Sequence, residues 1–256
     1  MNNFNNGNNN SYYNGNNYND GFNGNYGTPM TQSTSVGYAR YIAKTYLWMF
    51  FGLAITFGLS MYMTLNSYSV IDFIDSHFEL YMGACLISIL MVFAIGFLVY
   101  KLPPLVAKII FIVYAADMGV LLTPTLLVYS LSSVISVFAA TSVIYLALAI
   151  VGLTTKKDIS KWGSMLTFTL LGIILYSAIS YFFIHSSLNN IIIGAVFIAI
   201  FMGFTIFDNY RIKKQYNAFQ GNPQLLEKTS ILSALSLYLD YINIFIRLLS
   251  IFGKKR

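Results

Sequence analysis

The fold is decided by residues 230–252, which read Ser230-Ile-Leu-Ser-Ala-Leu-Ser-Leu-Tyr-Leu-Asp-Tyr-Ile-Asn-Ile-Phe-Ile-Arg-Leu-Leu-Ser-Ile-Phe252. Polar residues recur in this segment every three or four positions. They are Ser233, Ser236, Asp240, Asn243, Arg247 and Ser250. On a helix this spacing puts them all on one face. A helix that is apolar on its other sides is typical of a membrane helix whose polar face looks into a protein interior or a water-filled path.

Composition supports a membrane protein. The chain has 256 residues, of which 57% are hydrophobic and only 9% are charged. Soluble domains carry roughly 25% charged residues, so this chain has too few charges to cover a soluble surface. The formal net charge of +6 is explained by the attraction of basic clusters to anionic lipid. We therefore expect an integral protein of the lipid bilayer and no nucleic-acid partner.

Seven apolar segments are long enough to span a membrane, which takes about 20 residues. They are residues 42–65, 79–100, 104–124, 126–151, 163–185, 190–212 and 230–252. The break between the third and fourth segments is brief and lies at Thr123-Pro124-Thr125. The sequence therefore predicts an all-α membrane protein with seven transmembrane helices.

Residues 1–39 differ in character from the rest of the chain. Thirteen of the first 25 residues are Asn, interleaved with Gly and Tyr. Such a segment cannot bury enough apolar surface to fold. We predict a disordered tail over residues 1–39 and a membrane domain over residues 40–256. The tail is either a solvated spacer or a handle for a partner.

Basic residues predict the orientation. If every segment crosses, eleven Lys and Arg residues fall on one side of the membrane. They are Arg40, Lys44, Lys101, Lys108, Lys156, Lys157, Lys161, Arg211, Lys213, Lys214 and Lys228. The loops at residues 66–78, 125 and 186–189 contain none. By the positive-inside rule, the amino-terminal tail is predicted to be cytoplasmic in a multi-pass protein of the cell (plasma or inner) membrane.

The end of the chain opposes this rule. Lys254, Lys255 and Arg256 would lie outside after seven crossings. Either the last segment crosses despite these charges, or it is re-entrant and returns to the cytoplasm. Three charges are a modest force against six earlier crossings, so we favour a full crossing.

Three carboxylates lie within the apolar segments: Asp117, Asp208 and Asp240. At 1.5 Å per residue, Asp208 and Asp240 lie at similar depths of about 10 and 15 Å on adjacent helices. Two neighbouring carboxylates in a low-dielectric site tend to share a proton. They also supply oxygens to a hard cation, and two carboxylates with water make a weak, transient calcium site. Asp117 fits two roles, a third residue of an ion path or one end of an interhelical hydrogen bond.

Purely structural roles are alternatives for both aspartates of the pair. Asp208 has Arg211 three residues later as a partner. Asp240 and Arg247 are too far apart along one helix for direct contact, but Asn243 could bridge them. The chain lacks the GxSxG, HExxH, GxxxxGK[ST] and CxxC patterns. We therefore predict neither an enzyme nor a bound cofactor.

Four blocks of the chain resemble the Bax inhibitor-1 family, also called the transmembrane Bax inhibitor motif family. The closing block runs from Ala234 to Leu249, and it contains Leu-Tyr-Leu-Asp-Tyr-Ile-Asn. The others are Gly152-Leu-Thr-Thr-Lys-Lys-Asp-Ile-Ser-Lys-Trp-Gly-Ser164, Phe204-Thr-Ile-Phe-Asp208 and Tyr46-Leu-Trp-Met-Phe-Phe-Gly-Leu-Ala-Ile-Thr56. The resemblance covers residues 40–253 and is closest to the bacterial branch.

The resemblance implies a bundle whose last helix is central and surrounded by the other six. It also implies a pH-sensitive calcium leak with a di-aspartyl proton sensor, whose positions match Asp208 and Asp240. Some members carry an arginine in the second helix that latches the pair, but Leu80 to Val99 contains none. The latch residue is therefore open, and Arg247 is one base that could replace it.

Two functions follow as hypotheses. The first is a passive leak for calcium, controlled by protons, through the Asp208–Asp240 region, with Asp117, Asn243 and Arg247 as supporting residues. The second rests on bacterial relatives that bind and restrain a membrane-bound quality-control protease. In that case residues 1–39 would be the handle for the protease.

Overall fold

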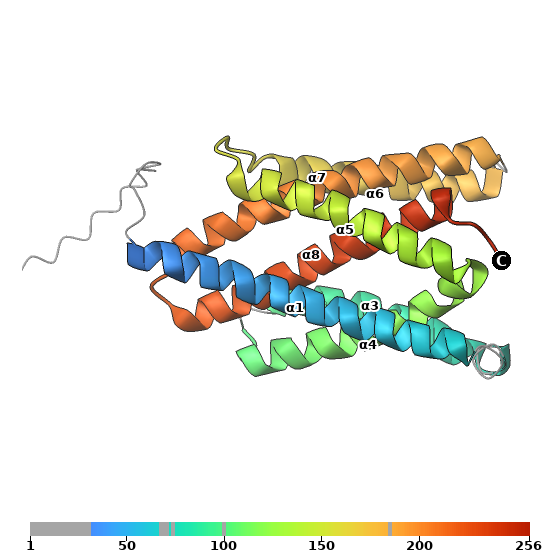
Figure 1. The fold of residues 1–256 in the computed structure, drawn as a ribbon, viewed down its shortest axis with the longest axis horizontal. Coiled ribbons are helices and arrows are strands. Elements are labelled where there is room, and N and C mark those ends of the chain that lie inside the picture. The colour runs from blue at the N-terminus through green and yellow to red at the C-terminus, as the bar shows by residue number, and fades with distance from the viewer. Residues whose placement is uncertain (1–31, 67–71, 73–74, 99–100, 184–185) are drawn as a thin grey trace, which may run out of the picture.

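The computed structural model describes residues 32–66, 72, 75–98, 101–183 and 186–256, and within them it contains seven long helices (Figure 1). They are α1 (Gln32–Leu65), α3 (Phe78–Leu98), α4 (Pro104–Val128), α5 (Leu131–Thr154), α6 (Trp162–Phe183), α7 (Ser187–Phe219) and α8 (Pro223–Phe252). All seven are long and apolar enough to cross a membrane. The predicted all-α, seven-helix membrane architecture is confirmed.

Helix α8 lies at the centre of the bundle. In an apolar 18-residue stretch of α8, 56% of the residues are buried inside the protein. The corresponding share in the other six helices is 11–33%. It packs against α1, α4, α5 and α7, while α3 packs on α4 and α6 packs on α7. The central position of the last helix is therefore confirmed. The helix has four main neighbours rather than six, and α3 and α6 form an outer layer (Figure 1).

Helix α8 begins at Pro223, seven residues before the predicted start. The Asn222 side chain caps it by accepting a hydrogen bond from the Leu225 amide at 3.1 Å. Proline in the first turn loses no needed hydrogen bond. These local signals start the helix within a polar segment. It then continues without a break to Phe252.

The predicted break at residues 123–125 is wrong. Helix α4 continues through Pro124 to Val128. A proline this close to the helix end removes one backbone hydrogen bond, which transmembrane helices tolerate. The turn comes instead at Ser130, whose hydroxyl accepts a hydrogen bond from the Ser133 amide as the N-cap of α5.

Helix α1 also extends into the predicted tail, because it begins at Gln32 rather than near residue 40. The Tyr38 ring packs on Tyr216 of α7 with centroids 5.3 Å apart. A Cβ at Gly37 would come within 2.4 Å of the Tyr216 hydroxyl. These contacts hold this part of α1 on the bundle. Residues 1–31 of the predicted tail lie outside the described residues.

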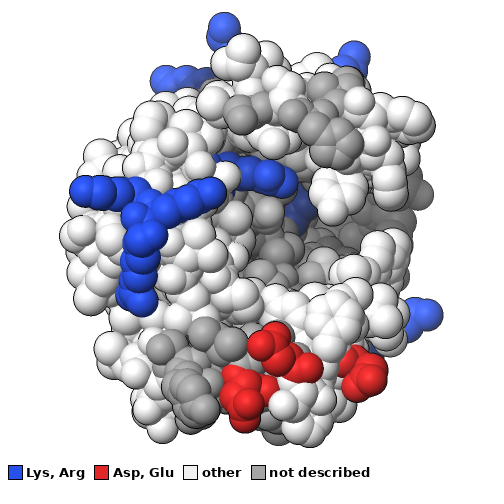
Figure 2. All heavy atoms as spheres, turned by 90° about the vertical axis from the view of Figure 1, so that its right-hand side faces the viewer, with Lys and Arg blue, Asp and Glu red and all other residues white. Residues whose placement is uncertain are grey.

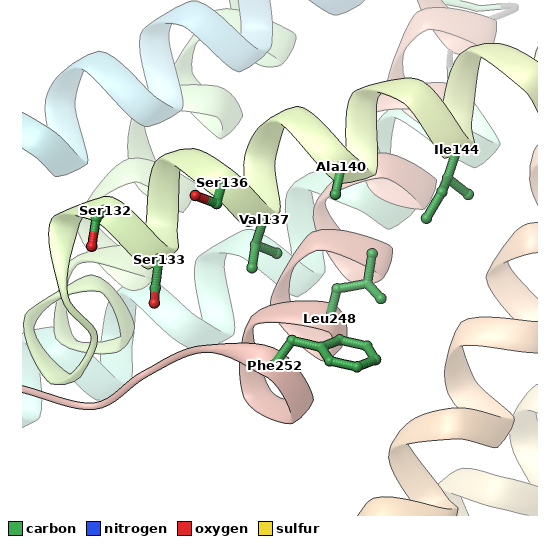
Figure 3. Close-up of a pocket in the computed structure, with 8 residues that line it drawn as sticks. All are labelled: Ser132, Ser133, Ser136, Val137, Ala140, Ile144, Leu248 and Phe252. Carbon is green, nitrogen blue, oxygen red and sulfur yellow. The ribbon is translucent and has the colours of Figure 1, made fainter.

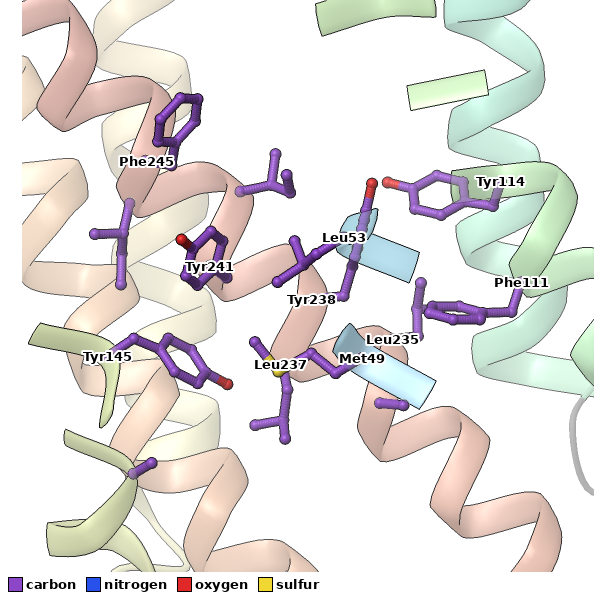
Figure 4. Close-up of a cluster of buried hydrophobic side chains, with 14 of the residues drawn as sticks. Met49, Leu53, Phe111, Tyr114, Tyr145, Leu235, Leu237, Tyr238, Tyr241 and Phe245 are labelled. Carbon is purple, nitrogen blue, oxygen red and sulfur yellow. The ribbon is translucent and has the colours of Figure 1, made fainter. Parts of the chain in front are cut away.

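Aromatic packing fixes α8 on the side away from α7 (Figure 4). Tyr238 is fully buried, and its ring lies 5.9 Å from both Phe111 and Tyr114 of α4. About two helical turns further along α8, Phe245 packs edge-on against Phe57 of α1, with ring centroids 5.0 Å apart. Such pairs contribute about 0.5–1.5 kcal/mol beyond their buried area. They hold the central helix in one rotational setting.

Candidate functional site

The polar stripe of α8 faces α7. Ser233 donates a hydrogen bond to Gln215 Oε1 of α7 at 2.6 Å. One turn further along α8, Ser236 accepts a hydrogen bond from Arg211 Nη2 at 3.2 Å. Partner numbers on α7 fall as numbers on α8 rise, which is the pattern of an antiparallel helix pair. The spacing that identified the stripe therefore places it along the α7–α8 interface.

Asp208 of α7 and Asp240 of α8 come together in this interface. They are only 7% and 4% exposed, and they are close enough to interact electrostatically. Arg211 joins them: its Nη1 lies 3.6 Å from Asp208 Oδ1, and its charge also acts on Asp240. Asp240 Oδ2 is buried with no hydrogen-bond partner among the described residues. The site thus holds two acids and one base.

Two further helices contribute polar groups around the pair. Tyr145 of α5 is buried, and its hydroxyl interacts electrostatically with both aspartates and with the Asn209 side chain. Figure 4 shows this ring reaching from α5 toward α8 beside Leu237. Tyr46 of α1 donates a hydrogen bond to Asn209, which follows Asp208 in the chain. The aspartates therefore lie among polar side chains of α1, α5, α7 and α8.

Polar side chains continue from the pair toward the α7–α8 turn. Gln215 accepts the hydrogen bond from Ser233, and its Oε1 also lies 3.4 Å from the Tyr41 hydroxyl. That hydroxyl lies 3.1 Å from Thr229 Oγ1. These groups form a ladder along the first half of α8. The end of the ladder lies at the predicted cytoplasmic end of the bundle.

The two polar residues beyond the pair do not extend this ladder. The Asn243 amide donates a hydrogen bond to the Leu239 carbonyl at 2.8 Å. The Arg247 guanidinium lies over the Phe197 ring, 4.2 Å from its centroid. Among the described residues no hydrogen bond joins either side chain to Asp240. The bridged Asp240–Asn243–Arg247 network is therefore not formed, and Arg211, not Arg247, is the base beside the pair.

Asp117 lies apart from the pair, on the α4 side of α8. It interacts electrostatically with Tyr114 and Tyr238. The Tyr238 hydroxyl instead forms a hydrogen bond of 2.7 Å with Thr56. Asp117 Oδ2 is buried and has no hydrogen-bond partner among the described residues. The structure thus gives no interhelical hydrogen bond to this oxygen and does not bring Asp117 to Asp208 and Asp240.

The donor set for a metal ion is small. Within the described residues, no group of three or more His, Cys, Asp and Glu side chains could hold a metal ion. Calcium takes 6–8 oxygen ligands, and the pair supplies two carboxylates. This set falls short of a closed structural site.

The loop between α5 and α6 is anchored close to this site. Asp158 Oδ1 accepts hydrogen bonds from Tyr210 Oη at 2.8 Å and from Lys214 Nζ at 3.2 Å, both on α7. It also accepts hydrogen bonds from the hydroxyl and backbone amide of Ser160. These hydrogen bonds, that of the Ser160 hydroxyl first, hold the pKa of Asp158 well below its usual range. The loop is thereby tied to the turn of α7 that carries Arg211.

Sequence comparison agrees with this architecture. A family model described as "Inhibitor of apoptosis-promoting Bax1" matches residues 38–256. This chain belongs to the Bax inhibitor-1 family. The resemblance inferred from the four sequence blocks is therefore confirmed, and the protein is a multi-pass membrane member of that family.

Curated relatives cover nearly the whole chain. The inner membrane protein YbhL of Escherichia coli K12 is 32% identical over 221 residues, which are 86% of this chain and 94% of YbhL. An uncharacterised membrane protein of Streptococcus pyogenes serotype M3 is 33% identical and covers 88% of this chain and 96% of its own length. An uncharacterised protein of Borreliella burgdorferi is 31% identical over 217 residues, which are 85% of this chain and 93% of that protein.

In this Bax inhibitor-1 family protein, two groups at the site escaped prediction from the sequence. Arg211 was considered only as a structural partner of Asp208, although its spacing of three residues was the available signal. Tyr145 had no signal, because it is one of 20 tyrosines and only the tertiary fold selects it. Helix α3, the second spanning helix, has no arginine between Phe78 and Leu98.

Proposed function

We propose that this protein is a passive cation leak in the cell or inner membrane, permeable to calcium and controlled by protons at Asp208 and Asp240. The observation that carries this proposal is the burial of two carboxylates beside one guanidinium at the interface of α7 and α8. Buried charges are costly unless they are balanced. Here the acids outnumber the base.

Charge balance gives the site two states. With both carboxylates ionised and Arg211 charged, the site carries one negative charge in excess. A proton removes that excess, and so does a passing cation. Protons and calcium therefore compete for the same oxygens. In the protonated state, Arg211 remains held by Asp208 and Ser236, which ties α7 to α8.

The two halves of α8 differ in the side chains that they present to α7. The polar ladder of Ser233, Gln215 and Tyr41 leads from the pair to the α7–α8 turn. The other half presents Arg247 over the Phe197 ring, and the positive charge of Arg247 repels a second cation. We propose that the closed state is sealed in this second half.

Orientation is part of the proposal. Basic residues gather in the loops at the end of the bundle that carries the start of α1 and the α7–α8 turn. By the positive-inside rule this end is cytoplasmic. The end of α8 at Phe252 then lies on the opposite side. The name of YbhL places that relative in an inner membrane, and we propose the same membrane for this protein.

Calcium flux into liposomes containing the purified protein tests the role of the pair. We expect the flux to change between about pH 6 and 8, because two neighbouring buried carboxylates tend to share a proton. Asp240→Asn should remove this pH dependence because it removes one of the two titrating carboxylates. Asp117→Asn is the matched control, since Asp117 lies in a different environment, and it should keep the dependence. An unchanged pH profile in Asp240→Asn would exclude the proposed sensor.

The regulatory alternative can be separated from the leak. Deletion of residues 1–31 leaves in place the contacts that Gly37 and Tyr38 of α1 make with Tyr216 of α7. If the tail binds a membrane-bound protease, the deletion should abolish co-purification of the protease and leave calcium flux unchanged. Loss of flux with the tail would instead tie residues 1–31 to the leak.

A further inference from the structure

A groove opens between the start of α5 and the end of α8, with a cavity volume of about 410 Å³. Ser132, Ser133 and Ser136 line it at one end, and Leu248 and Phe252 of α8 form its opposite wall (Figure 3). Phe252 is exposed at the surface of the bundle. The groove therefore joins a hydroxyl-rich mouth to an apolar wall on the side that meets lipid.

The groove has the length of one lipid leaflet. Its serines lie in the first two turns of α5, and its deep end is formed by Ala140 and Ile144 of the same helix. From Ser132 to Ile144 the helix rises about 18 Å. The hydrocarbon core of one leaflet is about 15 Å, half of about 30 Å. An acyl chain lying along the groove would place its headgroup at the serines.

The segment after α8 brings positive charge to this mouth. The Lys254 amide donates a hydrogen bond to Ser133 Oγ at 3.0 Å, and the Lys254 carbonyl accepts one from the Ser130 amide at 2.9 Å. The Arg256 amide donates to the Val128 carbonyl at 3.0 Å. The backbone of the basic segment, defined here as Lys254–Arg256, is thus bound to the turn between α4 and α5.

The charges of the basic segment are not compensated nearby. All three side chains are exposed, and no ion pair with them is found in the described part of the chain. The sequence has no Asp or Glu between Asp117 and Asp158, so the whole of α5 lacks acid. Figure 2 shows one group of Lys and Arg side chains on the face at this end and a separate group of acidic side chains, with further Lys and Arg at the hollow and at the rim.

A second groove of similar volume provides a comparison. It lies on α1, is lined by Lys44 and Trp48 among others, and measures about 410 Å³. There Lys44 Nζ lies 3.5 Å from Glu227 Oε1, and Lys108 contacts the same carboxylate. The positive charge of that groove is therefore shared with an acid. Of the two grooves, the one at α5 and α8 has the charge that attracts an anion.

We propose that the α5–α8 groove is a binding site for an anionic phospholipid. The phosphate lies at the Ser132, Ser133 and Ser136 hydroxyls and is attracted by the basic segment. One acyl chain follows the wall formed by Leu248 and Ile144. This site also gives a reason for three basic residues at the end of the bundle where the positive-inside rule disfavours them.

A tryptophan quenching experiment tests the site. The native tryptophans are removed by Trp48→Phe and Trp162→Phe, and Phe252→Trp places one reporter at the groove. Nanodiscs of phosphatidylcholine are then doped with brominated phosphatidylglycerol or with an equal amount of brominated phosphatidylcholine. Each basic residue near a membrane surface contributes about fivefold to the attraction of an anionic lipid. We expect brominated phosphatidylglycerol to be preferred by about tenfold or more.

Substitutions test whether the basic segment causes the preference for the anionic lipid. Replacing Lys254, Lys255 and Arg256 by Gln together should abolish it. The matched control replaces Lys156, Lys157 and Lys161 by Gln at the opposite end of the bundle and should keep it. Ala140→Phe fills the deep end of the groove and should weaken quenching by both lipids. Thermal unfolding of each variant in detergent verifies that it is folded.

Three outcomes would overturn the proposal. Equal quenching by the two lipids would show that no anionic headgroup is selected. A preference that survives the triple Gln variant would remove the basic segment from the site. Loss of the preference when inorganic phosphate is added at millimolar concentration, at constant ionic strength, would identify a site for a free anion instead of a lipid.

Discussion

The two faces of α8 differ in what they hold and in how they hold it. Toward α1 and α4 the helix presents Tyr238 and Phe245, which pack against rings. Toward α7 it presents Ser236 and Asp240, which meet Arg211 and Asp208. The aromatic face consists of ring contacts, with Asp117 beside Tyr114 and Tyr238. The polar face leaves Asp240 Oδ2 buried without a hydrogen-bond partner among the described residues.

This difference indicates that the two faces of α8 have separate roles. Aromatic packing holds α8 in position, and that position brings two acids to one base. A dry aromatic interface has no reason to respond to pH or cations. Under the proposed function, the acidic site, with an excess of one charge, responds to both. Substitutions on the aromatic face should therefore change stability, and those on the polar face should change flux.

The largest effect is expected from Phe245→Ala. This side chain is fully buried between Phe57 and Phe138, so truncation leaves a cavity in a well-packed region. Phe→Ala changes in cores cost about 3–5 kcal/mol. Thermal unfolding in detergent should show a large decrease in the melting temperature. Phe182→Ala is the control, because Phe182 is 72% exposed and its loss should change the melting temperature little.

A smaller loss is expected from Gly152→Ala, where α5 crosses α7. A Cβ there would lie 2.4 Å from the Ile206 carbonyl oxygen and 2.7 Å from Asn209 Cβ. The two helices would have to separate, and overpacking of this kind costs about 1–3 kcal/mol. Because Asn209 follows Asp208 in the chain, calcium flux should change with stability.

Gly172→Ala is the matched control for this close approach. Gly172 is also within a helix, but a Cβ there has no neighbouring atom within 4 Å. Replacing an unhindered helical glycine by alanine favours the helix by about 0.5–1 kcal/mol. The two substitutions should therefore move the melting temperature in opposite directions. A gain of stability in Gly152→Ala would contradict the close packing of α5 on α7.

The comparison of the two faces also shows what could be predicted from the sequence. The polar stripe predicted a last helix with a buried polar face, because polar residues in a spanning segment are costly unless they face the protein interior or water. The similar depths of Asp208 and Asp240 predicted that they meet. The aromatic face gave no such signal, since Phe and Tyr are common throughout the chain. Tyr145 and Tyr46 reach the site from α5 and α1, and only the packing of the helices shows this.

The predicted ends of α4 and α8 differ from the observed ends for local reasons. Pro124 indicated a break, but the tertiary fold accepts it in the last turns of α4. Hydropathy does not reveal the start of α8, because Gln224, Glu227 and Lys228 interrupt the apolar pattern and hydropathy is insensitive to the Asn222 cap. The sequence leaves the base beside the pair open, with Arg247 as one candidate. Arg247 belongs to the stripe, while Arg211 comes from the opposing helix.

The roles of these two arginines can be separated by pH. Arg211→Gln removes the guanidinium that favours ionised carboxylates at the pair, so protons should be held to higher pH. A neighbouring charge within 4–6 Å changes such an equilibrium by about 1–3 pH units, and we expect the midpoint of calcium flux to rise by about one unit. Arg247→Gln is the control, because Arg247 contacts Phe197. Its midpoint should not change.

The smallest effect is expected from Asp158→Asn, in the loop that ties α5 and α6 to α7. The pKa of Asp158 is held below its usual range, first by the Ser160 hydroxyl and then by the Ser160 amide, Tyr210 and Lys214. A lowered folded-state pKa adds stability that is present above the ordinary value of about 3.9 and is lost as the pH falls through the folded value. At pH 7 the variant should melt slightly below the native protein.

That difference should vanish in strong acid, where Asp158 is protonated in the native protein as well. Between pH 6 and 8 its charge is constant, so the midpoint of calcium flux should be the same with and without Asp158. Melting curves at pH 7 and at low pH, together with flux profiles, measure both quantities. A displaced flux midpoint would mean that the Asp158 tether also acts on the turn of α7 that carries Arg211. The proton response would then no longer belong to the polar face of α8 alone.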